Sequence, residues 1–304
     1  MNCIIGSNGF LGKQLVNVIK SIGEEYLTIP NSSSLDLLDR NKFKNFLKGR
    51  DITKIFNCAA FVGGIAFGYK YPVGMLDKNM IMTSNIYNAL KHYPNIRIIN
   101  PISNCSYPGN HEEFCEDKYW NGELHDSVKF YGFSRKAVII YSDAYKEQYN
   151  IKSINLCFSN MNGPNDHFDV HRSHALGAII KKICDAQKDK LNKITIWGDG
   201  TPIREWTYVE DAARVMLEYS NYDTEKNLIN IGVGKGISIK ELANLICEES
   251  GYDGSIIYDD SKPNGAKCKI MNVVDNEFNF TELRHGIKKT IEWYKKNNHE
   301  NNPR

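Results

Sequence analysis

The chain has 304 residues, of which 41% are hydrophobic, 24% charged and 11% aromatic. That content suits one large or two interlocked folded domains and excludes a disordered chain. Its 38 lysines and arginines nearly balance its 36 aspartates and glutamates, so the formal net charge is only +2. Nucleic-acid binding needs clustered basic surface, and a nucleic-acid partner is therefore not expected.

No apolar run approaches the roughly 20 residues that cross a bilayer, and the first residues have the pattern of a strand, not of a signal peptide. We expect a cytoplasmic protein without a membrane partner. Eight scattered cysteines form no CxxC pair, which fits neither a disulfide framework nor a metal site. Because free cysteine is commonly buried, we expect seven buried fillers, with Cys105 as the exception, and no bound metal.

Short apolar runs rich in β-branched residues alternate with segments of helical spacing over the first 160 residues. This alternation predicts an α/β fold, a Rossmann-type doubly wound parallel sheet with helices on both faces. The predicted strands lie within 2–6, 26–30, 54–60, 96–103 and 153–159. The predicted helices are 13–22, 79–90 and 135–149.

The pattern beyond residue 160 becomes richer in turns, which predicts a smaller second α/β domain with shorter elements. The segment 227–234 resembles a buried strand that returns to the main sheet. We therefore expect a main domain of residues 1–160 plus about 205–235, and a second domain of about 161–204 and 236–295. The polar residues 296–304 are expected to fray.

The first predicted strand leads directly into a glycine-rich turn and then a helix. Glycines let the backbone approach a pyrophosphate, and the helix directs unpaired N–H groups and its positive dipole end at the anion. A strand before and a helix after are the context that a dinucleotide fingerprint requires. The expected cofactor contacts are Gly6, Ser7, Asn8, Gly9, Phe10, Leu11 and Gly12.

The residues after the second strand bear on the type of cofactor. Asn31 and Ser32–Ser34 include no acid that would bind the adenosine ribose of NAD and repel the extra phosphate of NADP. This favours NADP(H), with NAD(H) as the alternative because no arginine follows to bind that phosphate. Asp36 has two equal interpretations, a contact near the adenine or the cap of a helix.

Ser103 ends a predicted strand and Tyr131 opens a predicted helix. A tyrosine gives a proton to a carbonyl oxygen as hydride arrives, provided a neighbouring cation lowers its pKa toward neutrality. A serine hydroxyl polarises the same oxygen. Together the two residues predict a carbonyl-reduction site.

Several segments extend this interpretation: GSNGFLG, NCAAFVGGI, SNCSYP, SNMNGPND, RSHALGAIIKK, WGDGTPIREW and SKPNG. With them the sequence resembles the extended short-chain dehydrogenase/reductase family and, within it, the GDP-L-fucose synthase branch, from Cys3 to about Tyr294. The resemblance implies that the main domain binds NADP and the second domain a GDP-sugar. It implies a homodimer through the helices of Tyr131–Tyr149 and Asn79–Leu90, although these helices also have the apolar faces to pack together within one chain.

The resemblance also assigns roles to single residues. Ser103 and Tyr131 become the reductase pair, and Cys105 and His174 the acid/base pair of an epimerisation. A ketone at carbon 4 acidifies the hydrogens on carbons 3 and 5, and a thiol and an imidazole both titrate near neutral pH. Further cofactor contacts are Ala59, Ala60 and Asn160, and further substrate contacts are Asn160, Lys182, Trp197, Arg204 and Asn264.

For three of these residues, the side-chain chemistry supports substrate binding or allows another interpretation. Arg204 offers a two-pronged donor for a pyrophosphate. Trp197 either stacks on the nucleotide or sugar or belongs to the core. Lys182 lies two helical turns after His174 and either faces the same pocket or is solvated.

The sequence departs from the family pattern at three positions. Arg135 replaces the lysine of Y-x-x-x-K, which exchanges a compact ammonium for a planar guanidinium. Lys136 would point about 100° further around the helix and is a poor substitute. Asn162 replaces a tyrosine before GP and Asn264 replaces the aspartate of SKPDG, which we expect to alter the substrate pocket.

We therefore expect an NADPH-dependent enzyme that reduces carbon 4 of a GDP-linked 4-keto sugar, either a 6-deoxyhexose or a heptose. The same enzyme would epimerise carbons 3 and 5 of that sugar. A reductase that acts on a GDP-4-keto-heptose after a separate epimerase is an alternative. Two others are a nucleotide-sugar 4-dehydrogenase or 4-epimerase that retains NAD, and a cofactor-binding protein inactivated by Arg135.

Overall fold

The computed structural model describes residues 1–304 except 170–171, 263, 274–277 and 298–304. A six-stranded parallel sheet in the order β10-β6-β4-β3-β1-β2 forms its centre, which confirms the predicted fold class. Its strands are β1 (Asn2–Ile5), β2 (Tyr26–Ile29), β3 (Lys54–Asn57), β4 (Arg97–Ser103), β6 (Ser153–Phe158) and β10 (Ile229–Ile231). The segment 227–234 thus supplies the predicted returning strand.

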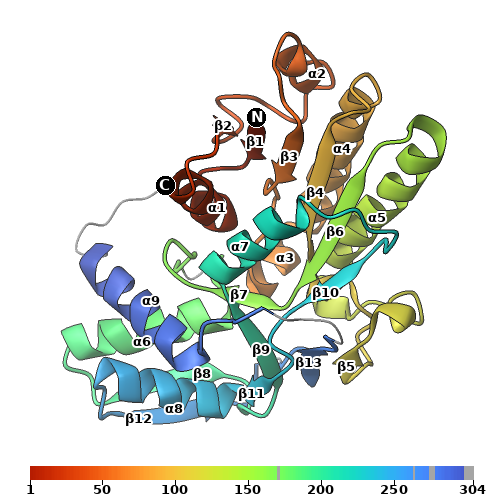
Figure 1. The fold of residues 1–304 in the computed structure, drawn as a ribbon. Coiled ribbons are helices and arrows are strands. Elements are labelled where there is room, and N and C mark those ends of the chain that lie inside the picture. Colours follow the sequence, from red (N-terminus) through yellow and green to blue (C-terminus); the bar gives the residue numbers. More distant parts are fainter. Residues whose placement is uncertain (170–171, 263, 274–277, 298–304) are drawn as a thin grey trace.

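Helices cover both faces of this sheet (Figure 1). Successive side chains of a strand point to opposite faces. Ile4 of β1 accordingly packs with α1 (Phe10–Ser21) and α7 (Val209–Tyr219). Its neighbours Cys3 and Ile5 pack in the core that contains α2 (Lys42–Leu47), α4 (Pro72–Leu90) and α5 (Lys129–Tyr149).

Helices α4 and α5 both begin earlier than their apolar spacing predicted, and they pack against each other. The ring centroid of Tyr87 on α4 lies 5.9 Å from that of Tyr141 and 5.3 Å from that of Tyr145. The Tyr87 hydroxyl is 2.7 Å from the Ser142 hydroxyl. One face of each helix is therefore buried within the chain.

A second core lies beneath the six-stranded sheet in Figure 1. It is enclosed by α6 (Ala175–Lys188), α8 (Ile239–Ser250), α9 (Leu283–Asn297), β8 (Lys193–Trp197) and β12 (Ser255–Asp259). These helices are as long as α1, so the expectation of shorter elements in this part was wrong. Residues 296 and 297 complete α9 and are not frayed, and the rest of the predicted tail, 298–304, is outside the described residues.

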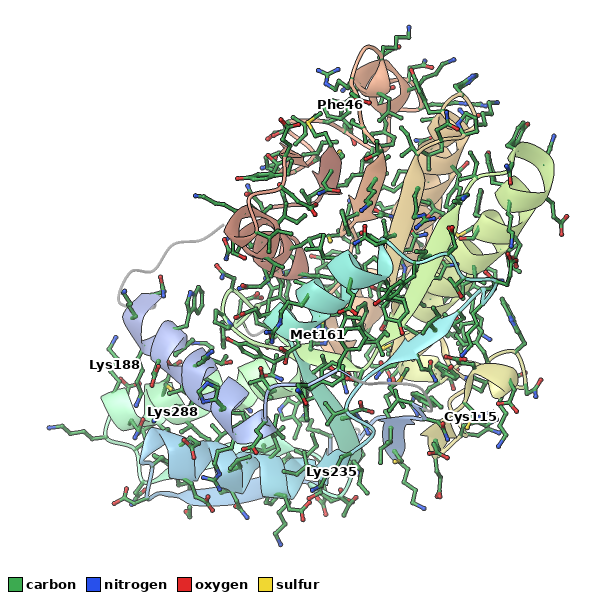
Figure 2. All side chains as sticks on the ribbon, in the orientation of Figure 1. Phe46, Cys115, Met161, Lys188, Lys235 and Lys288 are labelled. Carbon is green, nitrogen blue, oxygen red and sulfur yellow. The ribbon has the colours of Figure 1, made fainter. Side chains whose placement is uncertain are left out.

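Strand β9 (Ile203–Tyr208) connects the two parts of the molecule. It pairs with β7 (Asn160–Asn162), β11 (Gly236–Ser238) and β13 (Cys268–Met271), and β13 also pairs with β5 (Glu113–Phe114). Met161 of β7 packs on the core shared by α1 and α7 and lies near the centre of the molecule (Figure 2). The remaining elements are α3 (Ile65–Lys70) and three single helical turns, Asn104–Ser106, Glu116–Lys118 and Asp126–Val128.

The cysteines are all free, but they are less uniform than expected. Cys3, Cys157 and Cys184 are buried fillers, whereas Cys58, Cys115, Cys247 and Cys268 are partly exposed, as is Cys105. A thiol at the edge of a core or on a sheet edge has the same sequence pattern as a buried one. Within the described residues, no cluster of His, Cys, Asp and Glu suits a metal ion.

None of the helices among the described residues is both long and apolar enough to span a bilayer. The most apolar faces of α1, α6 and α7 are covered by the two cores.

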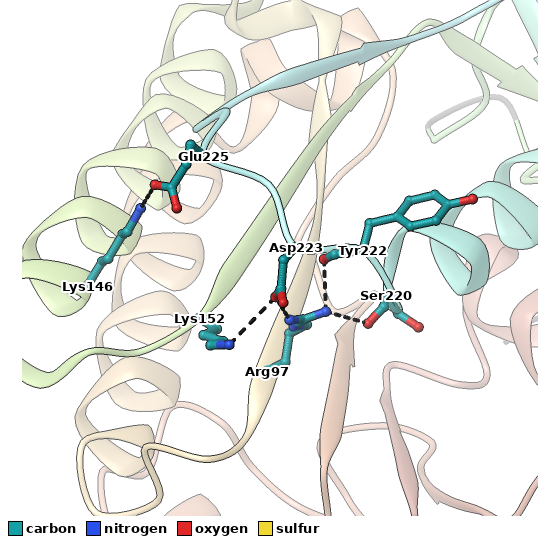
Figure 3. Close-up of polar contacts among 7 residues, drawn as sticks. All are labelled: Arg97, Lys146, Lys152, Ser220, Tyr222, Asp223 and Glu225. Carbon is teal, nitrogen blue, oxygen red and sulfur yellow. Dashed lines mark hydrogen bonds and ion pairs between the residues drawn. The ribbon is translucent and has the colours of Figure 1, made fainter. Parts of the chain in front are cut away.

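Arg97, at the start of β4, holds the connection between α7 and β10 (Figure 3). Its guanidinium donates to the carbonyl oxygens of Ser220 at 3.0 Å and Tyr222 at 2.9 Å, and it pairs with the Asp223 carboxylate. Lys152 lies 3.6 Å from the same carboxylate. The Arg97 side chain is only 16% exposed. It therefore holds the connection that precedes β10 against the start of β4.

Replacing Arg97 by alanine should lower the free energy of unfolding by about 1–3 kcal/mol, because hydrogen bonds to a charged, mostly buried group are lost together. Urea titration followed by circular dichroism measures the change. The matched control is Lys146→Ala, which removes an exposed ion pair with Glu225 in the same region and should cost about 0–1 kcal/mol. Equal losses in the two variants would contradict the assigned role of Arg97.

Candidate active site

The predicted site residues converge at the carboxyl edge of the six-stranded sheet. Gly6 follows β1, Ala59 follows β3, Ser103 ends β4 and Asn160 opens β7 shortly after β6. Ligands of open parallel sheets bind at this edge, because loops from neighbouring strands meet there.

The glycine-rich loop has the geometry of a phosphate cradle. Gly6 has a φ of +74°, a left-handed conformation that favours glycine. A Cβ on Gly12 would lie 2.2 Å from the carbonyl oxygen of Gly6, so the start of α1 approaches the loop only because Gly12 has no side chain. The first N–H groups of α1 have no intrahelical acceptor and point out of its N-terminal end. These features fit a dinucleotide.

The loop after β2 differs in detail from the expectation. The Asn31 side-chain oxygen accepts hydrogen bonds from the Ser33 and Ser34 hydroxyls at 2.7 and 3.1 Å, so these hydroxyl protons point to Asn31. Asp36 accepts the N–H of Leu38 and closes a turn, whereas Asp39 accepts N–H groups at the start of α2. The carboxylate at the start of α2 therefore belongs to Asp39, three residues further on, and the helix-cap interpretation of Asp36 was wrong.

The further predicted cofactor contacts, Ala59, Ala60 and Asn160, follow the ends of β3 and β6. A Cβ on Gly6 would lie 2.9 Å from the amide nitrogen of Ala59, so the loop and the segment Ala59–Ala60 are in direct contact. Asn160 donates its side-chain N–H to the carbonyl of Glu205 at 3.0 Å. This bond fixes the Asn160 amide against β9, close to the ends of the central strands.

Ser103 and Cys105 share a single turn. The Ser103 hydroxyl oxygen accepts the N–H of Cys105 at 3.2 Å, which leaves the hydroxyl proton free to be donated elsewhere. A Cβ on Gly132 would lie 2.4 Å from the carbonyl oxygen of Cys105. The start of α5, which carries Tyr131, therefore packs closely on this turn.

Tyr131 and Arg135 lie one helical turn apart on α5. The Arg135 guanidinium is 5.2 Å from the Tyr131 ring centroid, is only 4% exposed, and its Nε has no partner among the described residues. Burial raises the pKa of Tyr131, and the guanidinium only partly opposes this rise. The phenol thus stays protonated at neutral pH, contrary to the expected lowering of its pKa.

Lys136 does not replace the missing family lysine. Its ammonium donates to the carbonyl oxygen of Tyr119 at 2.6 Å and lies between the rings of Tyr119 and Trp120. This placement confirms that the next position on the helix points away from Tyr131.

Lys269 is a site residue that the sequence analysis missed. Its ammonium, on β13, donates to the Cys105 sulfur at 3.6 Å, and Lys269 is buried. The register of β13 against β9 places Lys269 opposite Arg204. In the sequence, Lys269 is one lysine in a K-C-K stretch, and only the pairing of β13 with β9 shows that it faces the site.

His174 occupies the N-terminal end of α6 and is exposed to solvent. Surrounding protein, and then the charges of His167 and Lys269, lower its pKa to about 4. The imidazole is therefore neutral at pH 7, and the expectation that it titrates near neutral pH was wrong.

The predicted substrate contacts Lys182, Trp197 and Arg204 lie on α6, β8 and β9. Trp197 is 55% exposed at the end of β8, so it is available for stacking and is not a core tryptophan. Lys182 is exposed, and its ammonium donates to the carbonyl oxygen of Thr195 at 2.6 Å, which places it at the surface beside β8. Arg204 lies next to Lys269 in the sheet.

Asn264 has a structural partner. Its side-chain oxygen accepts the N–H of Asp199 at 2.9 Å, and a Cβ on Gly198 would lie 2.1 Å from that oxygen. Aspartate and asparagine both provide this acceptor, so the exchange leaves the turn after Trp197 intact. The expected direct effect of Asn264 on the pocket is not what the structure indicates.

Asn162 was also expected to alter the pocket. It is only 1% exposed, and its side-chain N–H donates to the carbonyl oxygen of Thr207 at 3.3 Å. Its side-chain oxygen is buried without a partner among the residues that the structure describes, close to Gly286 of α9. The departure from tyrosine therefore lies in the packing between β7, β9 and α9, not in an open cleft.

Titration of His174 gives a direct test of this environment. We expect its imidazole to take up a proton with a midpoint near pH 4, measured by NMR and assigned with His174→Gln. Because this pKa is lower than the ordinary 6.5, the unfolded state binds the proton first, and the group reduces stability as pH falls from 6.5 to 4. A midpoint near 6.5 would contradict the described surroundings.

Removal of Lys269 should slow alkylation of Cys105, because a neighbouring ammonium stabilises the thiolate that reacts. We expect Lys269→Met to slow iodoacetamide labelling of Cys105 at pH 7.5 by about fivefold or more. Peptide mass spectrometry measures the rate, with partly exposed Cys115 (Figure 2) as internal reference. The control Lys267→Met removes an exposed lysine paired with Glu112 and should leave the labelling rate of Cys105 unchanged. An equal labelling rate in the unsubstituted protein and both variants would refute the role of Lys269.

The chain is similar to a known family and to several known proteins. The family model described as "NAD dependent epimerase/dehydratase family" matches residues 3–232. The GDP-L-colitose synthase of Yersinia pseudotuberculosis is 32% identical over 97% of this chain and 98% of its own. Two solved structures share the fold at 24% identity. They are an NADP-bound GDP-L-fucose synthetase from Naegleria fowleri (TM-score 0.88, covering 98% and 94% of the two chains) and a GDP-6-OMe-4-keto-L-xylo-heptose reductase from C. jejuni (TM-score 0.87, 98% and 98%). These matches confirm the resemblance, and the protein belongs to the NAD dependent epimerase/dehydratase family.

Proposed function

We propose that this protein reduces carbon 4 of a GDP-linked 4-keto sugar with NADPH and exchanges the configuration at carbons 3 and 5 before the reduction. The proposal rests on one observation above all. A serine, a tyrosine and a thiol meet at the carboxyl edge of the sheet, and buried cations lie against the tyrosine and the thiol.

The cofactor would be held by Gly6–Gly12 and the neighbouring Ala59–Ala60, with residues 1–160 and about 205–235 as its domain. The absence of an acid after β2 and the NADP in the Naegleria fowleri structure support NADP(H). When bound, the nicotinamide supplies a hydride.

Reduction requires the carbonyl oxygen to be polarised and protonated. The Ser103 hydroxyl accepts the Cys105 N–H, so its own proton would be free to bind the substrate oxygen. Tyr131, held protonated by burial, donates the proton. Arg135 would stabilise the phenolate that remains, because its guanidinium lies over the same ring.

Epimerisation requires a proton to leave one face of the sugar and to return on the other. Cys105 would remove the proton, because the Lys269 ammonium stabilises the thiolate and remains beside the sulfur. Neutral His174, at the N-terminal end of α6, would relay a proton from solvent to the opposite face.

The GDP-sugar would bind to the domain formed by residues of about 161–204 and 236–295. Arg204 would bind the pyrophosphate, Lys182 would contribute a second positive charge, and Trp197 would stack on the nucleotide or sugar. The GDP-L-colitose synthase relative supports a GDP-linked substrate, since it matches nearly the whole chain.

One observation favours a second candidate, a carbon-4 reductase without epimerase activity. General acid/base catalysis is most efficient when the pKa of the group lies near the working pH, and the pKa of His174 is lowered to about 4. Incorporation of deuterium from solvent into carbons 3 and 5, without NADPH, separates the two candidates.

We also propose a homodimer through the outer faces of α4 and α5. Phe133 and Ile140 of α5 are exposed and seven residues apart, so they lie on one face, and Ile81 of α4 is exposed as well. An exposed apolar face on two adjacent helices is typical of a subunit interface.

The reductase roles predict a graded effect of substitutions on α5. Tyr131→Phe should lower kcat for NADPH oxidation by about 100-fold or more, because the proton donor is lost. Arg135→Lys should retain activity within about tenfold, since the charge remains, whereas Arg135→Met should lose considerably more. Stopped-flow absorbance with GDP-4-keto-6-deoxymannose and its heptose counterpart measures the rates.

NADPH binding, measured by fluorescence titration, is the control for these variants and should be unchanged in Tyr131→Phe. Full activity of Tyr131→Phe, or full activity of Arg135→Met, would show that the assigned roles are wrong. Turnover that requires NAD and retains it would instead indicate a 4-epimerase.

The dimer proposal predicts that a charge on the outer face of α5 separates the subunits. Ile140→Glu combined with Ile81→Glu should sediment as a monomer, because two buried carboxylates per subunit are costly. The control is Ile22→Glu at the exposed end of α1, which should not affect the association. Analytical ultracentrifugation distinguishes the two species, and a monomeric unsubstituted protein would refute the proposal.

A further inference from the structure

The two residues that lead into His174 pack directly on the glycines after β3. The Gly64 N–H donates to the carbonyl oxygen of Arg172 at 3.0 Å. A Cβ on Gly64 would lie only 2.3 Å from the carbonyl oxygen of Ser173. This backbone contact is therefore possible only because Gly64 has no side chain.

Arg172 closes the contact with its side chain. One guanidinium nitrogen donates to the carbonyl oxygen of Val62 at 3.2 Å, and the guanidinium carbon lies 5.6 Å from the ring centroid of buried Phe67. A Cβ on Gly63 would lie 2.7 Å from that ring. Arg172 thus fits a surface made by Val62, Gly63 and Phe67.

The segment after β3 also contacts the glycine-rich loop at its other end. A Cβ on Gly6 would lie 2.9 Å from backbone atoms of Cys58 and Ala59, so these two stretches of backbone are in close contact. Residues 58–64 therefore connect the loop after β1 with the residues immediately before His174. A shift of either end would be transmitted along only seven residues of chain.

We infer that Arg172 is a positioning residue that locks the backbone before His174 onto Val62–Gly64, so that the imidazole is held relative to the nucleotide loop. A lock of this kind matters because a misplacement of about 1 Å can reduce a rate by about 100-fold. The consequence for epimerisation rests on the proposed function, whereas the lock itself does not.

The test compares Arg172→Met, which retains an apolar stem over Phe67 but loses the donor to Val62, with Arg172→Lys, which retains a donor. The control is Lys188→Met, which removes an exposed lysine at the C-terminal end of α6 (Figure 2). Thermal unfolding of each variant detects a general loss of stability. We expect the midpoints to agree within about 2 °C.

The first readout needs no substrate. Diethyl pyrocarbonate modifies neutral imidazoles, and peptide mass spectrometry gives the rate at His174 relative to exposed His285 of α9. We expect this ratio to rise about threefold or more in Arg172→Met, because the unlocked imidazole samples more conformations. Arg172→Lys and Lys188→Met should resemble the unsubstituted protein. An unchanged ratio in Arg172→Met would overturn the inference.

The second readout is catalytic. Deuterium incorporation into carbons 3 and 5 without NADPH should fall about tenfold in Arg172→Met, while the KM for the keto sugar and the rate of NADPH oxidation change by less than about twofold. Equal losses of incorporation and oxidation would overturn the positioning role. If the unsubstituted protein turns over no GDP-4-keto sugar, the proposed function fails, and the modification ratio still decides whether the lock exists.

Discussion

The geometry of the site depends on one buried carboxylate. Glu205 of β9 is fully buried and accepts N–H groups from Val233 and Gly234, which follow the last strand of the six-stranded sheet, and from Met271 of β13 at 2.6 Å. It therefore joins the two parts of the molecule with three hydrogen bonds. This arrangement requires a glycine at Gly232, since a Cβ there would lie 2.0 Å from the carboxylate. Burial raises the pKa of Glu205 to about 7 although the N–H groups oppose the rise. A neutral or charged form still accepts, but a shorter or longer side chain would move β13 and, with it, Lys269.

The position of β13 explains how a nearly uncharged protein can bind two phosphate-bearing ligands. The net charge is only +2, but Lys269, Arg204 and Arg135 are concentrated around one turn. Each is partly or fully withdrawn from solvent. Charge interactions between buried groups are less screened than those between groups at the surface. These cations can therefore stabilise a thiolate, a phenolate and a pyrophosphate locally, without a strong positive potential over the rest of the surface.

Much of this architecture could be predicted from local sequence. The alternation of short strands and helices predicted the sheet, and the returning strand at 227–234 was found from its apolar run, because periodicity is a local property. Ser103 and Tyr131 were paired from the chemistry of carbonyl reduction, whereas a role for Cys105 came only from the family resemblance. Lys269 was missed because its neighbour in space, Cys105, is 164 residues away and only strand pairing brings them together. The pKa of His174 and the buried location of Asn162 depend equally on distant groups, which no local pattern contains.

The proposed reaction is reduction of the sugar carbonyl at carbon 4, at the turn of Ser103 and Cys105. The most direct test uses NADPH carrying deuterium at the transferable position of its nicotinamide, with GDP-4-keto-6-deoxymannose and its heptose counterpart in ordinary water. Mass spectrometry and NMR of the product locate the label. One deuterium is expected at carbon 4 of at least one of the two sugars. Product without deuterium at carbon 4, or no NADPH consumption with either sugar, would contradict it.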